Sequence, residues 1–324
     1  MMKSKICDLF GIEYPIVQGG MQWLAVPEFA AEVSNAGGLG TLNSSLYTSK
    51  EELREGIRRL RSLTDKPFAL NISMLPVQVA GEMTNDFLAV AAEEKVPVVE
   101  LAGRDPKPYV PMLKEAGVKV IHKSTAIRFA KKAEAAGVDA VSIVGFECGG
   151  HPGMDDVSTM VLIPSVVDAV SVPVIAGGGI CDSRSYLAAR ALGAEGVVMG
   201  TRFVATNECL IHQNFKQLFV DLDERSTAIV QRSIKNASRD IKNETIKQLM
   251  ELENSSDHPL TLQEILPFVN GKRQRQAYLS GDVGDGAIPA GECIGRIHDI
   301  LSVKEVIEEI AVNSEKIIAS WVNR

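Results

Sequence analysis

The sequence predicts an α/β fold, specifically a (β/α)8 TIM barrel with a helical insertion or lid after its eighth strand. Short runs rich in Val and Ile alternate with segments rich in Ala, Glu, Lys and Arg, which is typical of βα units. Eight such runs lie within roughly 200 residues, a length that fits eight units closing into a barrel. An open doubly wound sheet is the alternative, but its dinucleotide-binding form needs GxGxxG after the first strand, and "QGGMQW" lacks that pattern.

Amphipathic segments separate the predicted strands. In 51–63 and 126–137, for example, apolar residues recur at helical spacing. In chain order, the predicted strands are 15–21, 38–45, 68–75, 98–103, 119–124, 140–146, 172–179 and 196–203.

A long polar and helical region follows the eighth strand and precedes the final predicted helix at 302–322. Its length and position indicate an insertion over the barrel mouth. We therefore predict two domains: residues 1–204 and 291–324 form the barrel, and residues 205–290 form a mainly helical insertion or lid.

Composition narrows the class of protein. The 324 residues include 34 Lys and Arg against 41 Asp and Glu, and the formal charge of −7 repels nucleic-acid phosphates and anionic membranes. No apolar run approaches the roughly 20 residues of a membrane helix, and the first residues lack the features of a signal peptide. The five cysteines are scattered without a CxxC pair, which favours a reducing compartment and predicts no metal site. We expect a cytoplasmic protein without nucleic-acid or membrane partners.

Two glycine-containing segments follow the seventh and eighth predicted strands, where barrels place their phosphate sites. Glycines let backbone N–H groups approach an anion, and the helix predicted from "DSRSYL" (182–187) points its positive end at the same place. For one segment alone, a tight strand-to-helix turn is the alternative explanation. The two segments together predict a phosphate cradle, and they contain Ala176, Gly177, Gly178, Gly179, Met199, Gly200 and Thr201.

The same rim carries residue types that suit a flat redox-active ring. Such a ring needs backbone donors beside one edge, an amide for its pyrimidine-like groups and a cation where electron density accumulates. "QGGMQW" (18–23) ends the first strand, Asn71 ends the third and Lys123 ends the fifth. Each also has an ordinary explanation, with Met21 as barrel lining, Asn71 as a strand-end cap and Lys123 as a solvated charge.

His151 follows the sixth strand within "FECGGHPGMDD" (146–156), where glycines and a proline offer its ring no packing partners. With an ordinary pKa near ~6.5, it is a candidate to give or take a proton at neutral pH. A plain turn residue is the alternative. Cys148 has no evident activating partner, so we expect it to be buried filler. His122 precedes Lys123 and points to the opposite face of its strand, so we expect a structural role.

With these residues in place, the chain resembles the nitronate monooxygenase family, also called 2-nitropropane dioxygenases, which are FMN-dependent barrels. The resemblance covers nearly the whole length and rests on an ordered set of motifs. They are "YPIVQGGMQW", "NAGGLGTL", "KVIHKSTAIRFAKKAEAAGVDAVSI", "GFECGGHPG", "PVIAGGGICD" and "GVVMGTRF".

The resemblance implies that the barrel domain binds FMN. His151 matches the active-site histidine of the family, near the flavin and the substrate. By the same resemblance, the phosphate would lie on Gly178, Gly179, Gly200 and Thr201, while Gly20, Met21, Gln22, Asn71 and Lys123 would surround the ring, with Gly149 and Gly150 beside it.

The family contains several activities, so the resemblance implies alternatives. The first expectation is oxidation of alkyl nitronates with O2 to a carbonyl compound and nitrite. The second is an NAD(P)H:quinone reductase with NADH or NADPH as co-substrate, which "DERSTAIVQRSIKNASRDIKN" (223–243) and "RQAYLSGD" (275–282) favour. A related group reduces enoyl thioesters on acyl carrier protein. Outside this family, a nucleotide barrel of the IMP dehydrogenase type is a different class that also uses a glycine cradle after strands seven and eight, and it would need Cys148 as its nucleophile.

The resemblance also implies contacts with a small-molecule substrate, either a nitronate or a quinone. Gln78 and Tyr278 match positions that contact nicotinamide or guard the pocket in the reductase-like members. Met21 and His151 would complete the substrate contacts. The oligomeric state stays open, with a homodimer as one expectation.

Overall fold

Eight parallel strands form one sheet in the computed structural model, which describes residues 4–74 and 82–322. The sheet order is β1-β8-β7-β6-β5-β4-β3-β2, and main-chain hydrogen bonds from Gln18 N to Leu39 O (3.0 Å) and from Leu39 N to Ile16 O (2.9 Å) connect β1 to the chain entering β2. The predicted (β/α)8 barrel is therefore confirmed. The strands are β1 Ile16–Gln18, β2 Gly40–Asn43, β3 Phe68–Ser73, β4 Val98–Ala102, β5 Lys119–Ser124, β6 Ala140–Val144, β7 Val174–Gly177 and β8 Gly196–Met199.

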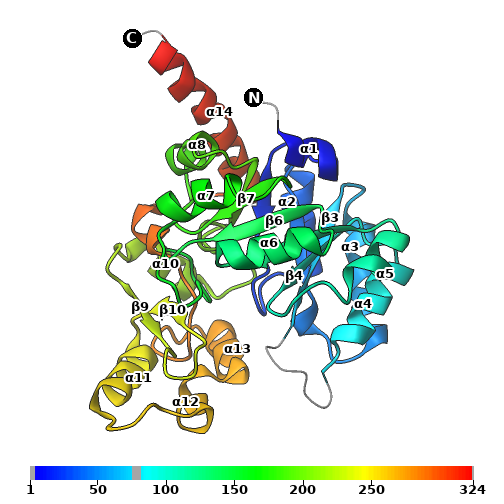
Figure 1. The fold of residues 1–324 in the computed structure, drawn as a ribbon. Coiled ribbons are helices and arrows are strands. Elements are labelled where there is room, and N and C mark those ends of the chain that lie inside the picture. Colours follow the sequence, from blue (N-terminus) through cyan, green and yellow to red (C-terminus); the bar gives the residue numbers. More distant parts are fainter. Residues whose placement is uncertain (1–3, 75–81, 323–324) are drawn as a thin grey trace.

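Helices connect successive strands and cover the outside of the barrel (Figure 1). The helix after β2 shows how the sequence specifies them: Ser49 accepts a hydrogen bond from Glu52 N (3.2 Å), and Leu53, Ile57 and Leu60 are buried at helical spacing. The covering helices are α2 Pro27–Asn35, α3 Lys50–Leu63, α4 Thr84–Glu93, α5 Val110–Glu115, α6 Ile127–Ala135, α7 Thr159–Val167 and α8 Ser183–Ala191.

The barrel interior is an apolar cluster whose amino-terminal end is closed by α1 (Lys5–Phe10). Side chains alternate between the two faces of a strand, so residues two positions beyond an interior residue also face inward. Three polar residues at the carboxyl ends of β3, β4 and β5 each lie two positions beyond an interior residue and therefore face inward. They are Asn71, Glu100 and Lys123. The interior strand residues are Val17, Leu39, Ala69, Val98, Ile121, Ala140, Val144, Ile175 and Val198.

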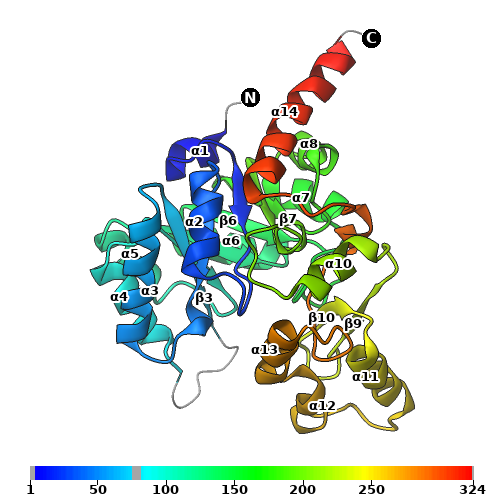
Figure 2. The ribbon, with the colours of Figure 1, turned by 180° about the vertical axis from the view of Figure 1, so that it is seen from behind.

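The chain after β8 forms the short helix α9 (Thr201–Val204) and then the region that the sequence predicts as an insertion. In Figures 1 and 2 this region lies at the end of the molecule opposite α1. Besides helices, it contains an antiparallel hairpin of β9 and β10, and it has a small apolar core of its own. Its elements are α10 Gln213–Asp221, β9 Thr227–Val230, β10 Ser238–Ile241, α11 Glu244–Ser255, α12 Leu262–Val269 and α13 Gly271–Ser280.

The chain then returns to the barrel through a 3-10 turn, Glu292–Arg296, and ends in α14 (Val303–Val322). Helix α14 packs against α8 and α2, and its last turns extend beyond the body of the molecule (Figure 2). The predicted final helix at 302–322 matches α14 to within one residue.

Candidate active site

A buried polar network lies at the inner face of β3, β4 and β5. Asn71 Nδ2 donates to Glu100 Oε2 (2.6 Å), and Lys123 Nζ donates to the same oxygen (3.0 Å). Glu100 is 2% exposed, and its second oxygen, Oε1, has no hydrogen-bond partner among the described residues. A buried carboxylate oxygen without a partner is costly, which makes this oxygen a site for a ligand or a water. The structure thus brings Asn71 and Lys123 together through Glu100, a residue that the sequence analysis missed.

The loop after β1 passes so close to this network that a side chain would not fit. A Cβ atom on Gly20 would lie 2.4 Å from Asn71 Cγ. Strand β1 ends at Gln18, before the predicted end of the strand at residue 21. Met21 lies beside Gly200, where an added Cβ would be 3.8 Å from Met21 Sδ. Gln22 instead extends to the start of α13, so the loop joins the barrel mouth to the insertion.

The turn after β7 presents free backbone amides. Gly178 and Gly179 have φ angles of +93° and +75°, a region that favours glycine. Neither amide donates a hydrogen bond within the described residues. Thr159 fixes the turn from the side, because its Oγ1 donates to Gly178 O (3.0 Å) and contacts Glu147 Oε2 (2.7 Å). The two amides are therefore available to an anion such as a phosphate.

The segment after β8 supplies the other half of the predicted cradle. Gly200 directly precedes α9, and Thr201 Oγ1 accepts a hydrogen bond from Gly291 N (2.9 Å). The side chains of Ala176 and Met199 pack in the outer layer between strands and helices, so only their backbones face the mouth.

Helix α8 corrects one part of the sequence analysis. We expected its positive end to face the phosphate, but Asp182 caps that end by accepting from Ser185 N (2.8 Å). The Asp182 carboxylate also pairs with Arg296 (2.8 Å). A helix start that already carries its own carboxylate does not offer its positive end to a phosphate.

The loop between β6 and α7, which carries His151, is held by the insertion. Gly150 N donates to Arg239 O (3.0 Å), and Arg239 N donates to Gly150 O (2.6 Å), so the loop pairs with β10. A Cβ atom on Gly149 would lie 2.7 Å from the carbonyl carbon of Ala290. Gly149 therefore has no room for a side chain, and Gly150 has a φ angle of +75°, a region that favours glycine.

Arg239 fastens the hairpin to this loop through its side chain. The guanidinium lies 4.5 Å from the centre of the Phe146 ring and donates twice to Phe146 O (3.2 and 3.0 Å). It also donates to Thr227 Oγ1 (3.1 Å) and pairs with Glu292 (2.8 Å). A buried arginine with this many partners fixes the position of the loop.

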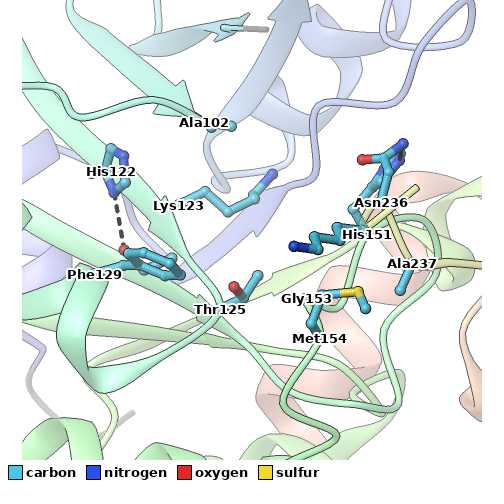
Figure 3. Close-up of a pocket in the computed structure, with 13 residues that line it drawn as sticks. Ala102, His122, Lys123, Thr125, Phe129, His151, Gly153, Met154, Asn236 and Ala237 are labelled. Atoms are coloured by element: carbon cyan, nitrogen blue, oxygen red, sulfur yellow. Dashed lines mark hydrogen bonds between the residues drawn. The ribbon is translucent and has the colours of Figure 1, made fainter. Parts of the chain in front are cut away.

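The His151 side chain borders an open cavity of about 230 Å³ (Figure 3). Its Nε2 atom lies 3.1 Å from Nδ2 of Asn236, which belongs to the turn of the hairpin. Although the residue is exposed to the solvent of the cavity, the protein atoms packed around the ring lower the pKa of His151 by desolvation. The neutral imidazole is therefore favoured at neutral pH.

The cavity combines cationic and apolar side chains. Lys123 and Lys235 contribute positive charge, while Phe129 (39% exposed) and Met154 (40% exposed) form an apolar edge. The complete lining is Ala102, Gly103, His122, Lys123, Ser124, Thr125, Phe129, His151, Gly153, Met154, Lys235, Asn236 and Ala237.

The remaining predicted residues lie elsewhere or outside the described chain. Gln78 falls within 75–81, outside the described residues. Tyr278 is buried in the insertion, where it packs edge-on against Phe215 and accepts a hydrogen bond from Gln274 (3.2 Å). Tyr278 is not part of the cavity lining.

The sequence analysis expected a structural role for His122 and buried packing for Cys148, which the structure instead leaves half-buried. Both ring nitrogens of His122 have protein partners, Ser124 Oγ at 2.9 Å and Arg104 O at 3.3 Å, in agreement with a structural role. Burial raises the pKa of the Cys148 thiol to about 12, with Lys123 and Arg239 opposing the shift. A thiol this hard to ionise does not support a nucleophilic role.

Residues 4–74 and 82–322 contain neither a cluster suited to a metal ion nor a helix suited to span a membrane. No group of three or more His, Cys, Asp or Glu side chains there could hold a metal ion. No helix in the same residues is long and apolar enough to cross a membrane.

The closed eight-stranded barrel places the molecule in the class of (β/α)8 barrels. The model of the nitronate monooxygenase family matches residues 3–313, so the chain belongs to this family of flavin-dependent oxidoreductases.

Relatives within this group carry different names. A Rhodococcus jostii protein named (3aS,4S,5R,7aS)-5-hydroxy-7a-methyl-1-oxo-octahydro-1H-indene-4-carboxyl-CoA dehydrogenase is 32% identical, over 97% of this chain and 96% of its own. A probable nitronate monooxygenase of Staphylococcus saprophyticus is 31% identical, over 80% of this chain and 84% of its own.

Similar proteins of solved structure also carry different names. FabK from Thermotoga maritima is 37% identical with a TM-score of 0.90, and the match covers 100% of this chain and 99% of that one. Nitroalkane oxidase from Streptomyces ansochromogenes is 26% identical with a TM-score of 0.82, over 98% and 99% of the two chains.

Proposed function

We propose that the barrel mouth binds FMN. Three observations support this fit: the free amides of Gly178 and Gly179, the absence of room for a side chain at Gly20, and the unpartnered oxygen of buried Glu100. The glycine amides would hold the phosphate, and Asn71 and Lys123 would face the ring. One phosphate suits this cradle, and "QGGMQW" offers no dinucleotide fingerprint, so FAD is not expected.

We further propose that the protein oxidises alkyl nitronates with O2 to a carbonyl compound and nitrite. The observation that carries this proposal is the charge of the cavity, in which Lys123 and Lys235 lie with the neutral ring of His151. Glu100 pairs with Lys123, whereas Lys235 has no ion pair among the described residues. The cavity therefore favours a small anion, and a nitronate is a small organic anion with two oxygen atoms.

FMN, when bound, would supply the capacity to take electrons from the substrate. The protein's own residues would orient the reactants and shape the field around them. Lys123 places a positive charge at the mouth, and Glu100 and Asn71 keep it in position. Arg239 holds the hairpin against the loop of His151 and would thereby fix the position of the histidine beside the substrate.

A second candidate is oxidation or reduction of an acyl thioester. The exposed edge of Phe129 and Met154 favours it, because an apolar acyl chain could pack there while the rest of the substrate remains in solvent. The full-length similarity to a carboxyl-CoA dehydrogenase supports the same class of substrate. The NAD(P)H:quinone reductase alternative depends on Gln78, which lies outside the described residues.

Anaerobic mixing experiments separate these candidates. Purified holoprotein is mixed with propionate nitronate, a short-chain acyl-CoA, NADH or NADPH, each in a separate run, and the visible flavin absorbance is followed. We expect prompt bleaching with the nitronate and an oxidised flavin for minutes with the other three. Bleaching by acyl-CoA or by NAD(P)H, with no response to the nitronate, would replace the nitronate proposal with the corresponding alternative.

A charge variant tests the cavity itself. Lys235→Gln should raise the KM for the nitronate by about 10-fold, the effect of one lost charge-assisted contact of about 1.4 kcal/mol. Lys247→Gln, an equal change of charge on the exposed face of α11, is the matched control and should leave the KM unchanged. Equal KM values for both variants would remove Lys235 from the substrate site.

A further inference from the structure

The hairpin turn of the insertion places an amide against the active-site histidine. Asn236 Nδ2 lies 3.1 Å from His151 Nε2, and the same nitrogen donates to Gln231 Oε1 (3.4 Å). Gln231 is buried (6% exposed), and its backbone N–H donates to Glu253 Oε1 (2.8 Å). His151 and Asn236 lie together on one side of the cavity, across from Phe129 (Figure 3).

The direction of the contact follows from the chemistry of the amide. A side-chain amide nitrogen only donates hydrogen bonds, so His151 Nε2 must accept and carries no proton. In the observed orientation, the Asn236 side-chain nitrogen donates to both His151 Nε2 and Gln231 Oε1 (3.4 Å), so it faces an acceptor on each side. In a neutral ring with an unprotonated Nε2, the proton resides on Nδ1.

The second ring nitrogen is therefore the one left for a ligand. Within the described residues, His151 Nδ1 forms no hydrogen bond. The accepting nitrogen of the neutral ring is occupied by Asn236, and the remaining nitrogen donates. A ring in this state offers a hydrogen bond to a substrate oxygen and has no free lone pair with which to remove a proton.

We propose that Asn236 is a positioning residue that holds His151 as the Nδ1–H tautomer, and that His151 serves the substrate as a hydrogen-bond donor instead of a base. The inference rests on the proposed function and deepens it, because it selects the substrate class. A nitronate has already lost its α-proton and presents two oxygens to a donor. A neutral nitroalkane needs a base to remove that proton, so it is excluded as a substrate.

The tautomer can be measured without turnover. The 15N chemical shifts of imidazole nitrogens distinguish protonated from unprotonated nitrogen, and a His151→Gln sample identifies the signals among the five histidines. In the holoprotein we expect a protonated Nδ1 and an unprotonated Nε2. Asn236→Asp should reverse this pattern, because a carboxylate accepts from Nε2–H. An Nε2–H tautomer in the unaltered protein would overturn the proposal.

Two substitutions of His151 test the role of the donor. The asparagine side-chain nitrogen is separated from the backbone by the same number of bonds as Nδ1, and the glutamine nitrogen by the same number as Nε2. His151→Asn should therefore keep kcat/KM for propionate nitronate within about 10-fold, whereas His151→Gln should lose about 100-fold or more. Flavin content and melting temperature confirm that both variants fold. Equal losses in the two variants would contradict the donor role.

The outcomes separate this inference from the proposed function. If the nitronate fails to reduce the flavin while the NMR spectrum shows Nδ1–H, the nitronate activity is wrong and the tautomer assignment stands. If the nitronate is oxidised and the spectrum shows Nε2–H, the activity stands and the role of Asn236 is wrong. Turnover of neutral 2-nitropropane at a rate similar to its nitronate would also contradict the donor role, because it would require a base.

Discussion

Asp240 is a buried carboxylate in β10 with a single hydrogen bond. It is 1% exposed, its Oδ2 accepts from Ser238 Oγ (2.7 Å), and its Oδ1 has no partner among the described residues. Desolvation raises the pKa of Asp240 from 3.8 to about 6, with the Ser238 hydrogen bond opposing the shift. The folded protein therefore holds this proton at pH values where the unfolded chain has released it.

This shift predicts how stability depends on pH. The folded state binds more protons between pH 3.8 and about 6, so the free energy of unfolding falls as pH rises through that window. Asp240→Asn keeps an acceptor for Ser238 and removes the charge. By linkage, roughly two pKa units at 1.36 kcal/mol each make the variant about 3 kcal/mol more stable than the parent above pH 6, with no advantage below about pH 4.

Urea unfolding at several pH values between 4 and 8 provides the measurement. A stability difference that stays constant over this range would show that the Asp240 charge is not the cause.

At the scale of single residues, the sequence analysis identified site residues that lie at the ends of predicted strands. It missed residues whose role depends on a hydrogen-bond partner elsewhere in the sequence. Asn71 and Lys123 were predicted because each ends a strand. Glu100 was missed because "VVELAG" has the apolar composition of a buried strand, and nothing in it indicates that its carboxylate bonds to Asn71 and Lys123 on the neighbouring strands. Asn236 was missed because it meets His151 across 85 positions of sequence.

At the scale of elements, the β9–β10 hairpin is the part of the insertion that reaches the barrel. Arg239 connects it to the His151 loop through the Phe146 carbonyl, Thr227 and Glu292. Arg239→Met should lower the free energy of unfolding by about 3–5 kcal/mol, because it leaves buried partners without their cation. Arg225→Met, in the same insertion with a side chain 81% exposed, is the matched control and should show no measurable change.

Urea unfolding measures both arginine variants, and hydrogen exchange over residues 146–153 reports on the loop. Equal stability of the two variants, or unchanged exchange in the loop, would mean that Arg239 does not hold the hairpin in place.

The prediction of helices and strands succeeded where local sequence signals are strong. It failed where contacts between distant segments determine where a strand ends or pairs. The helix after β2 was predicted at 51–63 and observed as Lys50–Leu63, because its cap and apolar spacing are local. β1 was predicted to continue to residue 21, but it ends at Gln18 and the chain then passes close to Asn71, a segment distant in the sequence. The hairpin was not predicted, since it is completed by pairing with Gly150 and Pro289 outside the hairpin.

At the scale of the whole molecule, the alternation of βα units was enough to predict the closed barrel, and the strand order confirms it. The chemistry at the mouth depends on three separate parts of the chain. The β3–β5 network, the glycine turn after β7 and the hairpin of the insertion meet there. The site therefore forms only when the whole chain has folded. For predicting it, the resemblance of the whole chain to a family was more informative than any single motif.

The central claim is that this mouth is an FMN site, and the most direct measurement is the mass of the cofactor released from the purified protein. The account predicts FMN at about one per chain, and it predicts loss of flavin in Gly178→Asp, because a Cβ at this position (φ +93°) would lie 2.9 Å from Thr159 Oγ1 and displace the turn whose amides would hold the phosphate. Release of FAD, or no flavin retained after reconstitution with FMN, would contradict the account.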